Sequence, residues 1–178
     1  DPQMPSRGIF HSRDGGRSWK PSTSDQFSDA HVLDISFPLD DKDQVYAATS
    51  NYGVLKSQDA GESWVQVNNG LTEGRWVNAV EVDSHNNQRV YAGISFGGIF
   101  RSEDGGQSWT QASVGLPPEA DISSIVIHPE VPNVIFAADK FTGVNYSTDG
   151  GDTWQRFNKD LRMKALNPDM QIYVLYRD

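Results

Sequence analysis

An eight-residue motif recurs four times in this chain at a constant distance. It reads SRDGGRSW from Ser12, SQDAGESW from Ser57, SEDGGQSW from Ser102 and STDGGDTW from Ser147. Successive copies start 45 residues apart, and a fixed period of about 20 to 50 residues is typical of repeated supersecondary units. The spacing therefore indicates a repeat architecture in which each copy marks one unit.

The residues between the motifs predict four short β-strands per unit. VYAATS, VYAGIS and IFAADK begin at Val45, Val90 and Ile135, align at this offset, and are rich in β-branched and aromatic residues. GVLKS, GIFRS and GVNYS lead into the motif, a short strand follows each tryptophan, and VLDISF, VNAVEV and ISSIVI precede the next unit. A four-stranded unit of about this length is one propeller blade, so we predict an all-β chain, a β-propeller with four-stranded antiparallel blades.

The prediction gives three full blades and a partial blade at each end of the single domain 1–178. The full blades run from Val32 to about Asn68, from Val77 to about Ser113 and from Ile122 to about Asn158. The N-terminal partial blade has a third and fourth strand (Gly8 to about Lys20), and a last strand is predicted at Ile172 to Tyr176. The repeat units are about 1–44, 45–89, 90–134 and 135–178. Because uncapped repeats expose apolar faces and strand edges, we expect self-association or the remaining blades of a longer chain to complete the ring.

The motif is predicted to form the hairpin between the third and fourth strands. Its aspartate accepts backbone N–H bonds within the turn, its glycine supplies a positive φ, and its tryptophan packs toward the neighbouring sheet. The second copy differs from the others, because Ala60 replaces a glycine. The predicted structural residues are Ser12, Asp14, Gly16, Trp19, Ser57, Asp59, Gly61, Trp64, Ser102, Asp104, Gly106, Trp109, Ser147, Asp149, Gly151 and Trp154.

This spelling, Ser/Thr-x-Asp-x-Gly-x-x-Trp, resembles the Asp-box, or BNR, repeat. Asp-boxes occur in β-propellers such as sialidases, xyloglucan hydrolases, sortilin-type receptors and the photosystem II assembly factor. The four copies cover nearly the whole chain. The resemblance implies a propeller fold, a structural role for the boxes away from the working site, and an extracellular or periplasmic location.

The candidate ligand face is formed by the loops at the other ends of the strands. These loops carry aromatic and charged residues, and His31, Trp76 and Asp121 share one repeat position. Such a rim suits a sugar or an extended peptide; the alternative is that these are ordinary loop and inter-blade packing residues. The candidate ligand-binding residues are Tyr52, Arg75, Trp76, Phe96, Asp121 and Phe141.

Composition excludes several classes of partner. Fifteen basic and 24 acidic residues give a formal charge of −9, which disfavours nucleic acid and anionic membrane surfaces. No apolar run approaches the roughly 20 residues that span a bilayer, and no secretory leader precedes Asp1, so we expect no membrane insertion.

The sequence also indicates no metal and no cofactor. The chain contains no cysteine, so it can form neither a disulfide nor a thiolate metal site. Its four histidines lack the spacing of a zinc site. The acidic loop with Asp40, Asp41 and Asp43 lacks the pattern of an EF-hand, and we interpret it as a solvated turn.

No catalytic set is evident in the sequence. The resemblance would require three convergent arginines for a sialidase, or an aspartate in a TDxGG context for a xyloglucan hydrolase. Asp139 in AADKFTG is the nearest approach, and Asp121 or Asp34 could be proposed as the second carboxylate of a glycosidase. We predict a non-catalytic scaffold that binds a protein or glycan; the alternative is part of a glycan-active hydrolase whose catalytic residues lie partly outside this chain.

Overall fold

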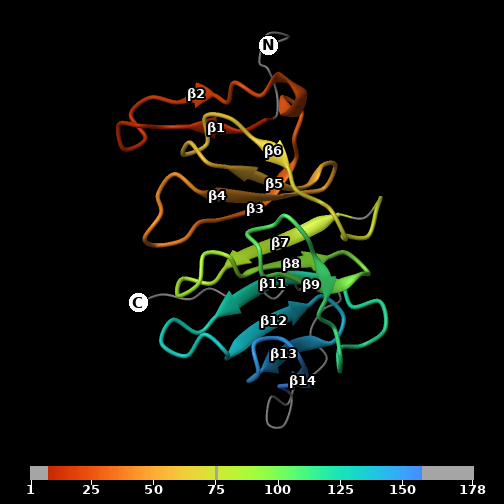
Figure 1. Ribbon diagram of the computed structural model, residues 1–178. Helices are drawn as coiled ribbons and strands as arrows, with labels where there is room; N and C mark the ends of the chain where they lie inside the picture. The colour runs from red at the N-terminus through yellow and green to blue at the C-terminus, as the bar shows by residue number, and fades with distance from the viewer. Residues whose placement is uncertain (1–7, 75, 158–178) are drawn as a thin grey trace.

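The computed structural model describes residues 8–74 and 76–157 of the chain. This part folds into three four-stranded antiparallel sheets and one two-stranded sheet, arranged in chain order (Figure 1). Within each sheet, strands that are consecutive in sequence are hydrogen-bonded neighbours. The predicted fold class, an all-β propeller with three full blades and a partial N-terminal blade, is confirmed.

We number the sheets as blades 0 to 3, and their strand bounds repeat from blade to blade. Blade 0 contains β1 (Phe10–His11) and β2 (Lys20–Pro21) and is followed by the 3₁₀ turn η1 (Asp25–Phe27). Blade 1 contains β3 (Val32–Ser36), β4 (Val45–Thr49), β5 (Gly53–Ser57) and β6 (Val65–Gln66). Blade 2 contains β7 (Val77–Val82), β8 (Val90–Ile94), β9 (Gly98–Ser102) and β10 (Thr110–Gln111). Blade 3 contains β11 (Ile122–Ile127), β12 (Ile135–Asp139), β13 (Gly143–Ser147) and β14 (Gln155–Arg156). The predicted strand at Ile172 to Tyr176 lies outside the described residues.

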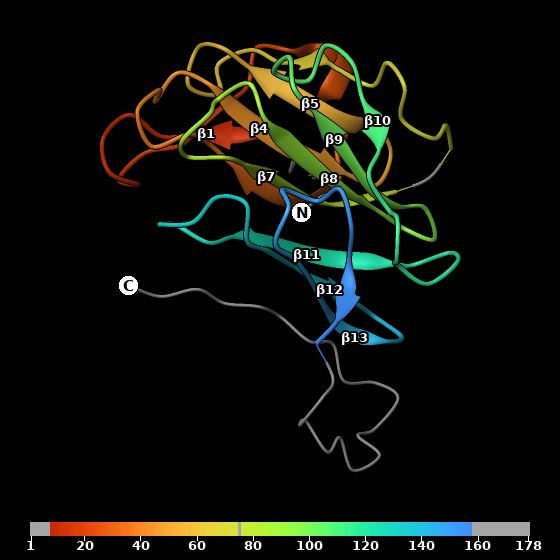
Figure 2. The same cartoon turned by 60° about the horizontal axis from the view of Figure 1, so that its bottom comes forward.

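The first strands of the blades lie side by side. β7 contacts β3 on one side and β11 on the other, and Figure 2 shows β7 next to β11. Each of these strands has a register irregularity at the same repeat position, between Val32 and Asp34, Val77 and Ala79, and Ile122 and Ser124. The repeat therefore extends to the fine geometry of the sheets.

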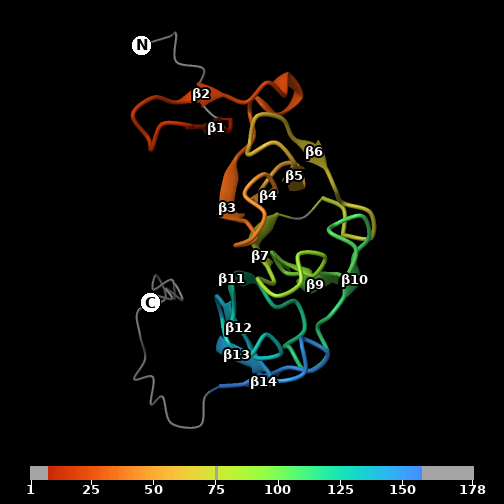
Figure 3. The same cartoon turned by 60° about the vertical axis from the view of Figure 1, so that its left-hand side comes forward.

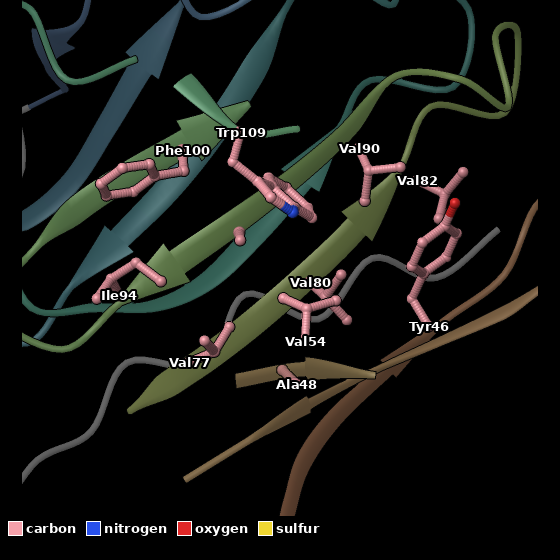
Figure 4. Close-up of a cluster of buried hydrophobic side chains, with 11 residues drawn as sticks. Tyr46, Ala48, Val54, Val77, Val80, Val82, Val90, Ile94, Phe100 and Trp109 are labelled. Atoms are coloured by element: carbon pink, nitrogen blue, oxygen red, sulfur yellow. The ribbon is translucent and has the colours of Figure 1, made fainter. Parts of the chain in front are cut away.

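Apolar side chains fill the space between neighbouring blades. Between blades 1 and 2, Tyr46, Ala48 and Val54 pack in one cluster with Val80 and Val82 of β7 (Figure 4). The equivalent cluster between blades 2 and 3 joins three strands of blade 2 (β7, β8 and β9) to β11 and β12. Face-to-face burial of apolar surface is thus the main stabilisation between blades.

The N-terminal end of this series leaves part of β3 uncovered. Ile35 of β3 and Phe37, which directly follows β3, are exposed, whereas Val80 and Val82 at the same repeat positions of blade 2 are buried. The difference arises because, among the described residues, blade 0 consists of β1 and β2 alone, which form its outer half at one end of the series in Figure 3. The first two strands of a complete blade would cover this surface.

Polar side chains of the first strand of blade 1 bond to backbone N–H groups of the first strand of blade 2. Asp34 accepts the N–H of Val80 at 3.0 Å, and Ser36 Oγ accepts the N–H of Val82 at 3.1 Å. Ser36 Oγ also donates to Glu81 Oε2 at 3.1 Å. Burial raises the pKa of Glu81 to about 7, and burial also raises the pKa of Asp34. Two carboxyl groups at this boundary are therefore destabilised in their ionised forms.

Each Asp-box is closed by the same set of hydrogen bonds. In the third box, Ser102 Oγ donates to Asp104 at 2.7 Å and accepts the N–H of Gly106 at 2.8 Å. Asp104 also accepts the N–H of Ser108 at 2.8 Å and the hydroxyl of Ser108. The four predicted glycines have φ between 84° and 89°, so the predicted turn chemistry is confirmed.

Sequence reasoning missed the hydroxyl residue that precedes each tryptophan. Its side-chain hydrogen bond is the main reason that the pKa of Asp14, Asp104 and Asp149 is lowered to about 2. The pKa of Asp59 is lowered for the same reason. These hydroxyl residues are Ser18, Ser63, Ser108 and Thr153. Recurrence of Ser or Thr at one repeat position was the signal that could have identified them.

Three of the four box tryptophans are packed against the blade that precedes their own. The indole N–H of Trp109 donates to the carbonyl of Val67, and that of Trp154 to the carbonyl of Ala112, both at 2.8 Å. Trp64 is also buried. Trp19 is 63% exposed, so the prediction that all four are packed is wrong for Trp19. No blade precedes blade 0 among the described residues, so Trp19 has no neighbouring sheet to pack against there.

Ala60 is expected to be a point of backbone strain. It has a φ of +57°, in the left-handed region, where the other boxes have glycine. Ala60→Gly should raise the free energy of unfolding by about 1 kcal/mol, measured by urea denaturation. Gly150→Ala is the matched control: a Cβ there would lie 3.5 Å from Asn133 Oδ1 without a clash, but φ is +74°. The Gly150→Ala variant should have a free energy of unfolding lower by a similar amount. A gain in its stability would contradict the strain argument.

Candidate functional site

Three exposed aromatic side chains form a row at the ends of the strands opposite the boxes. Trp76 directly precedes β7, Phe96 lies between β8 and β9, and Phe141 lies between β12 and β13. They are 58%, 45% and 69% exposed, respectively. The rings of Phe96 and Phe141 are 5.7 Å apart with an interplanar angle of 31°. Trp76 and Phe96 line a shallow pocket of about 240 Å³, so this aromatic row continues from blade 2 to blade 3.

A groove adjoins the aromatic row at the boundary of blades 1 and 2. It encloses about 480 Å³, and Trp76 and Tyr52 are among the residues that line it. Tyr52 contributes its carbonyl oxygen, which accepts hydrogen bonds from the side-chain amides of Gln66 and Asn68, both at 2.8 Å. The other lining residues include Ser50, Asn51, Leu71, Thr72 and Glu73. The sequence prediction included the loops SNYG and EGRW in the candidate face but selected only Tyr52, Arg75 and Trp76 from them, and it missed Leu71 and Thr72, which resemble ordinary loop residues.

Tyr52 does not stack with the aromatic row. The repeat position of Phe96 and Phe141 is occupied in blade 1 by Asn51, one residue earlier than Tyr52. The ring of Tyr52 packs edge-on against Phe27 at 5.1 Å. Its hydroxyl donates to Asp29, and this hydrogen bond raises the pKa of Tyr52.

Asp121 lies beneath the row and does not face solvent. It is 3% exposed, and its Oδ1 lies 3.2 Å from Lys140 Nζ and accepts the side-chain amide of Asn78 at 2.8 Å. Asp139 is 2% exposed and accepts three backbone N–H groups. Both carboxylates therefore support the surface loops and do not present their oxygens with the aromatic rings.

The remaining sequence candidates lie elsewhere. Arg75 lies outside the described residues. His31 is exposed, and its backbone N–H donates to the side chain of Asn51 at 3.0 Å. In the acidic loop, Asp41 accepts the N–H of Asp43 at 3.1 Å, as in an ordinary turn.

The described ranges show neither a metal-binding cluster nor a membrane-spanning helix. Residues 8–74 and 76–157 contain no group of three or more His, Cys, Asp or Glu side chains arranged to hold a metal ion. Nor does this part of the chain contain a helix with the length and apolar character needed to cross a membrane.

The box hairpins and the stacked four-stranded sheets define the class of protein. They are the elements of an Asp-box β-propeller, and the chain forms a segment of one. The family model Sortilin-Vps10, described as "Sortilin, neurotensin receptor 3", matches residues 52–171. The chain therefore belongs to this family. No curated protein matches the chain.

Solved structures with the same fold include enzymes and YCF48. The chain is similar to an ancestral GH74 enzyme with a TM-score of 0.70 and 20% identity, over 86% of this chain and 21% of that one. For the GH74 xyloglucanase from Xanthomonas campestris the TM-score is 0.69 at 16% identity, over 85% and 27%. For YCF48 from Cyanidioschyzon merolae it is 0.55 at 19% identity, over 71% and 36%. At these identities the likeness concerns the fold alone, and the chain spans about a quarter of the GH74 structures.

Proposed function

We propose that this chain is a non-catalytic binding module that holds a glycan through the aromatic row and the adjoining groove. The observation that carries the proposal is the exposure of Trp76, Phe96 and Phe141 as one row, with Trp76 bordering the groove. Exposed aromatic residues beside a concave surface commonly mark binding sites.

The chemistry of the surface suits an uncharged saccharide. Sugar rings pack their C–H faces against aromatic rings, and their hydroxyl groups exchange hydrogen bonds with amides and hydroxyls. The groove is lined by the hydroxyl residues Ser50 and Thr72, and Glu73 is the acidic residue among its lining residues. The side-chain amides of Asn51, Gln66 and Asn68 also line it and bond to neighbouring backbone groups. Rigid rings also lose little conformational entropy on binding.

The surroundings of the two nearest carboxylates support a binding role. Glycoside hydrolysis requires two carboxyl groups that flank the scissile bond. Asp121 and Asp139 are buried and engaged by neighbouring groups. A hydrolase would draw its catalytic groups at least partly from blades outside this chain.

We further propose that the binding module works outside the cytoplasm and within a larger ring. The exposed apolar residues of β3 and the exposed Trp19 support the second point, because equivalent residues in blades 2 and 3 are covered by the preceding blade. Either further blades or a second copy of this chain would cover them.

The combined variant Trp76→Ala and Phe96→Ala is expected to lose binding and keep its fold. A glycan array identifies the ligand, and titration calorimetry should show a loss of about 2–3 kcal/mol, which is about 30- to 150-fold in affinity. Both side chains are exposed loop residues, so thermal unfolding should change little.

Trp19→Ala is the control, because Trp19 is an equally exposed tryptophan on a box hairpin. It should bind the glycan as the parent chain does. Unchanged affinity of the double variant, binding of peptides in place of glycans, or turnover of a glycan that requires Asp121 or Asp139 would each refute the proposal.

A further inference from the structure

We propose that Asp139 is the positioning residue of the aromatic row. Its buried carboxylate fixes the loop that presents Phe141, and through Asp121 it ties this loop to blade 2. The proposal deepens the glycan-binding function and rests on it for its binding measurements. The measurement of ring contacts between Phe96 and Phe141 does not depend on that function.

The carboxylate of Asp139 organises the turn that follows β12. Oδ1 accepts the N–H of Phe141 at 2.8 Å and the N–H of Thr142 at 2.7 Å. Oδ2 accepts the N–H of Asp121 at 3.1 Å. Hydrogen bonds from backbone N–H groups to a buried carboxylate are charge-assisted and strong, so Phe141 leaves the sheet in one defined direction.

The residues that occupy the repeat position of Asp139 in blades 1 and 2 show how a side-chain acceptor there affects the turn. In blade 1 it is Thr49, whose Oγ1 accepts the N–H of Tyr52 at 2.9 Å. In blade 2 it is Ile94, whose side chain cannot accept a hydrogen bond. There the turn takes another form, in which Phe96 adopts a φ of +52°. The residue at this position therefore selects the turn and hence the direction of the aromatic side chain.

Asp121 extends the network across the blade boundary. Its Oδ1 accepts the side-chain amide of Asn78, a residue of β7, at 2.8 Å, and that amide also donates to the carbonyl of Ile122 at 3.0 Å. Lys140, which lies next to Phe141 in sequence, donates from Nζ to both oxygens of Asp121. These bonds fix the blade 3 loop relative to blade 2, and so they fix Phe141 relative to Phe96.

The test uses three substitutions at Asp139 in the whole chain. Asp139→Ala removes all acceptors, Asp139→Asn keeps one oxygen for the N–H groups of Phe141 and Thr142, and Asp139→Thr introduces the residue that serves blade 1. Nuclear Overhauser contacts between the rings of Phe96 and Phe141 should disappear in the alanine variant and persist in the other two. Thr49→Ala is the matched control and should leave these contacts unchanged.

Binding of the glycan found on the array gives the second measurement. Asp139→Ala should bind roughly tenfold more weakly, Asp139→Thr should recover most of the affinity, and adding Asp139→Ala to Phe141→Ala should cost nothing further. If Asp139→Ala acted only by lowering overall stability, Asp139→Thr should lose as much affinity. Adding Asp139→Ala to Phe141→Ala should then also lower the affinity further.

Persistence of the ring contacts in Asp139→Ala would overturn the proposal. Loss of these contacts without loss of affinity would overturn it as well, because Phe141 would then not contact the ligand. If the array shows no glycan, the proposed function fails, while the ring contacts still decide whether Asp139 positions Phe141.

Discussion

Trp109→Ala should lower the free energy of unfolding by about 3–5 kcal/mol, the usual cost of removing a buried tryptophan. The indole is 3% exposed and belongs to the cluster between blades 1 and 2, in which Figure 4 shows it beside the side chains of β7 to β9. Its removal also leaves the carbonyl of Val67 without its donor. Urea denaturation measured by far-UV circular dichroism checks the value.

Trp19→Ala is the internal comparison for this prediction. Trp19 occupies the same position in the first box but is 63% exposed, so its replacement should change stability by less than about 0.5 kcal/mol. Equal losses for the two variants would mean that Trp19 is covered in solution, by a second copy or by residues outside the described ranges.

Glu81→Gln should stabilise the protein above neutral pH by up to about 3 kcal/mol, and should have little effect near pH 4. Burial raises the pKa of Glu81 from 4.5 to about 7. The folded state therefore binds more protons than the unfolded state between these values, and stability falls as the pH rises through this interval. Glutamine keeps an acceptor for its neighbours without the buried charge, so the variant should lack this loss.

The box aspartates produce the opposite limb of the pH profile. Their hydrogen bonds lower the pKa of Asp14, Asp104 and Asp149 to about 2. The stability that these carboxylates contribute is fully present above their ordinary pKa of about 4 and is lost as the pH falls toward 2. The parent chain should thus be most stable near pH 4 to 5.

Thermal unfolding from pH 2 to pH 8 tests both limbs together. Glu130→Gln is the control for Glu81→Gln, because Glu130 is exposed and its replacement should leave the profile unchanged. A parent chain whose stability rises steadily from pH 5 to pH 8, with Glu81→Gln following the same curve, would contradict the assignment of Glu81.

The sequence was sufficient for the repeat, the strands and the boxes because each depends on local chemistry. The 45-residue period, the β-branched and aromatic residues of segments such as Val90–Ile94, and the Ser-x-Asp turn with its glycine are all properties of short stretches of chain. At Ala60 the sequence showed only a departure from the repeat, and the positive φ of this residue was found in the structure, because the sequence prediction had assigned positive φ to the glycine that follows it.

The tertiary structure decided which equivalent residues share an environment. Trp19 and Trp109 occupy the same position of the box, but of the two only Trp109 has a preceding blade to pack against within the described residues. The sequence predicted Asp121 as an exposed rim residue like Trp76, but in the structure its side chain is buried and bonded to Lys140 and Asn78. Contacts across blade boundaries join residues about 40 or more positions apart in sequence, and the local pattern carries no information about them. For that reason the burial of Asp121, the raised pKa of Glu81 and the pairing of Phe96 with Phe141 appear only in the folded chain.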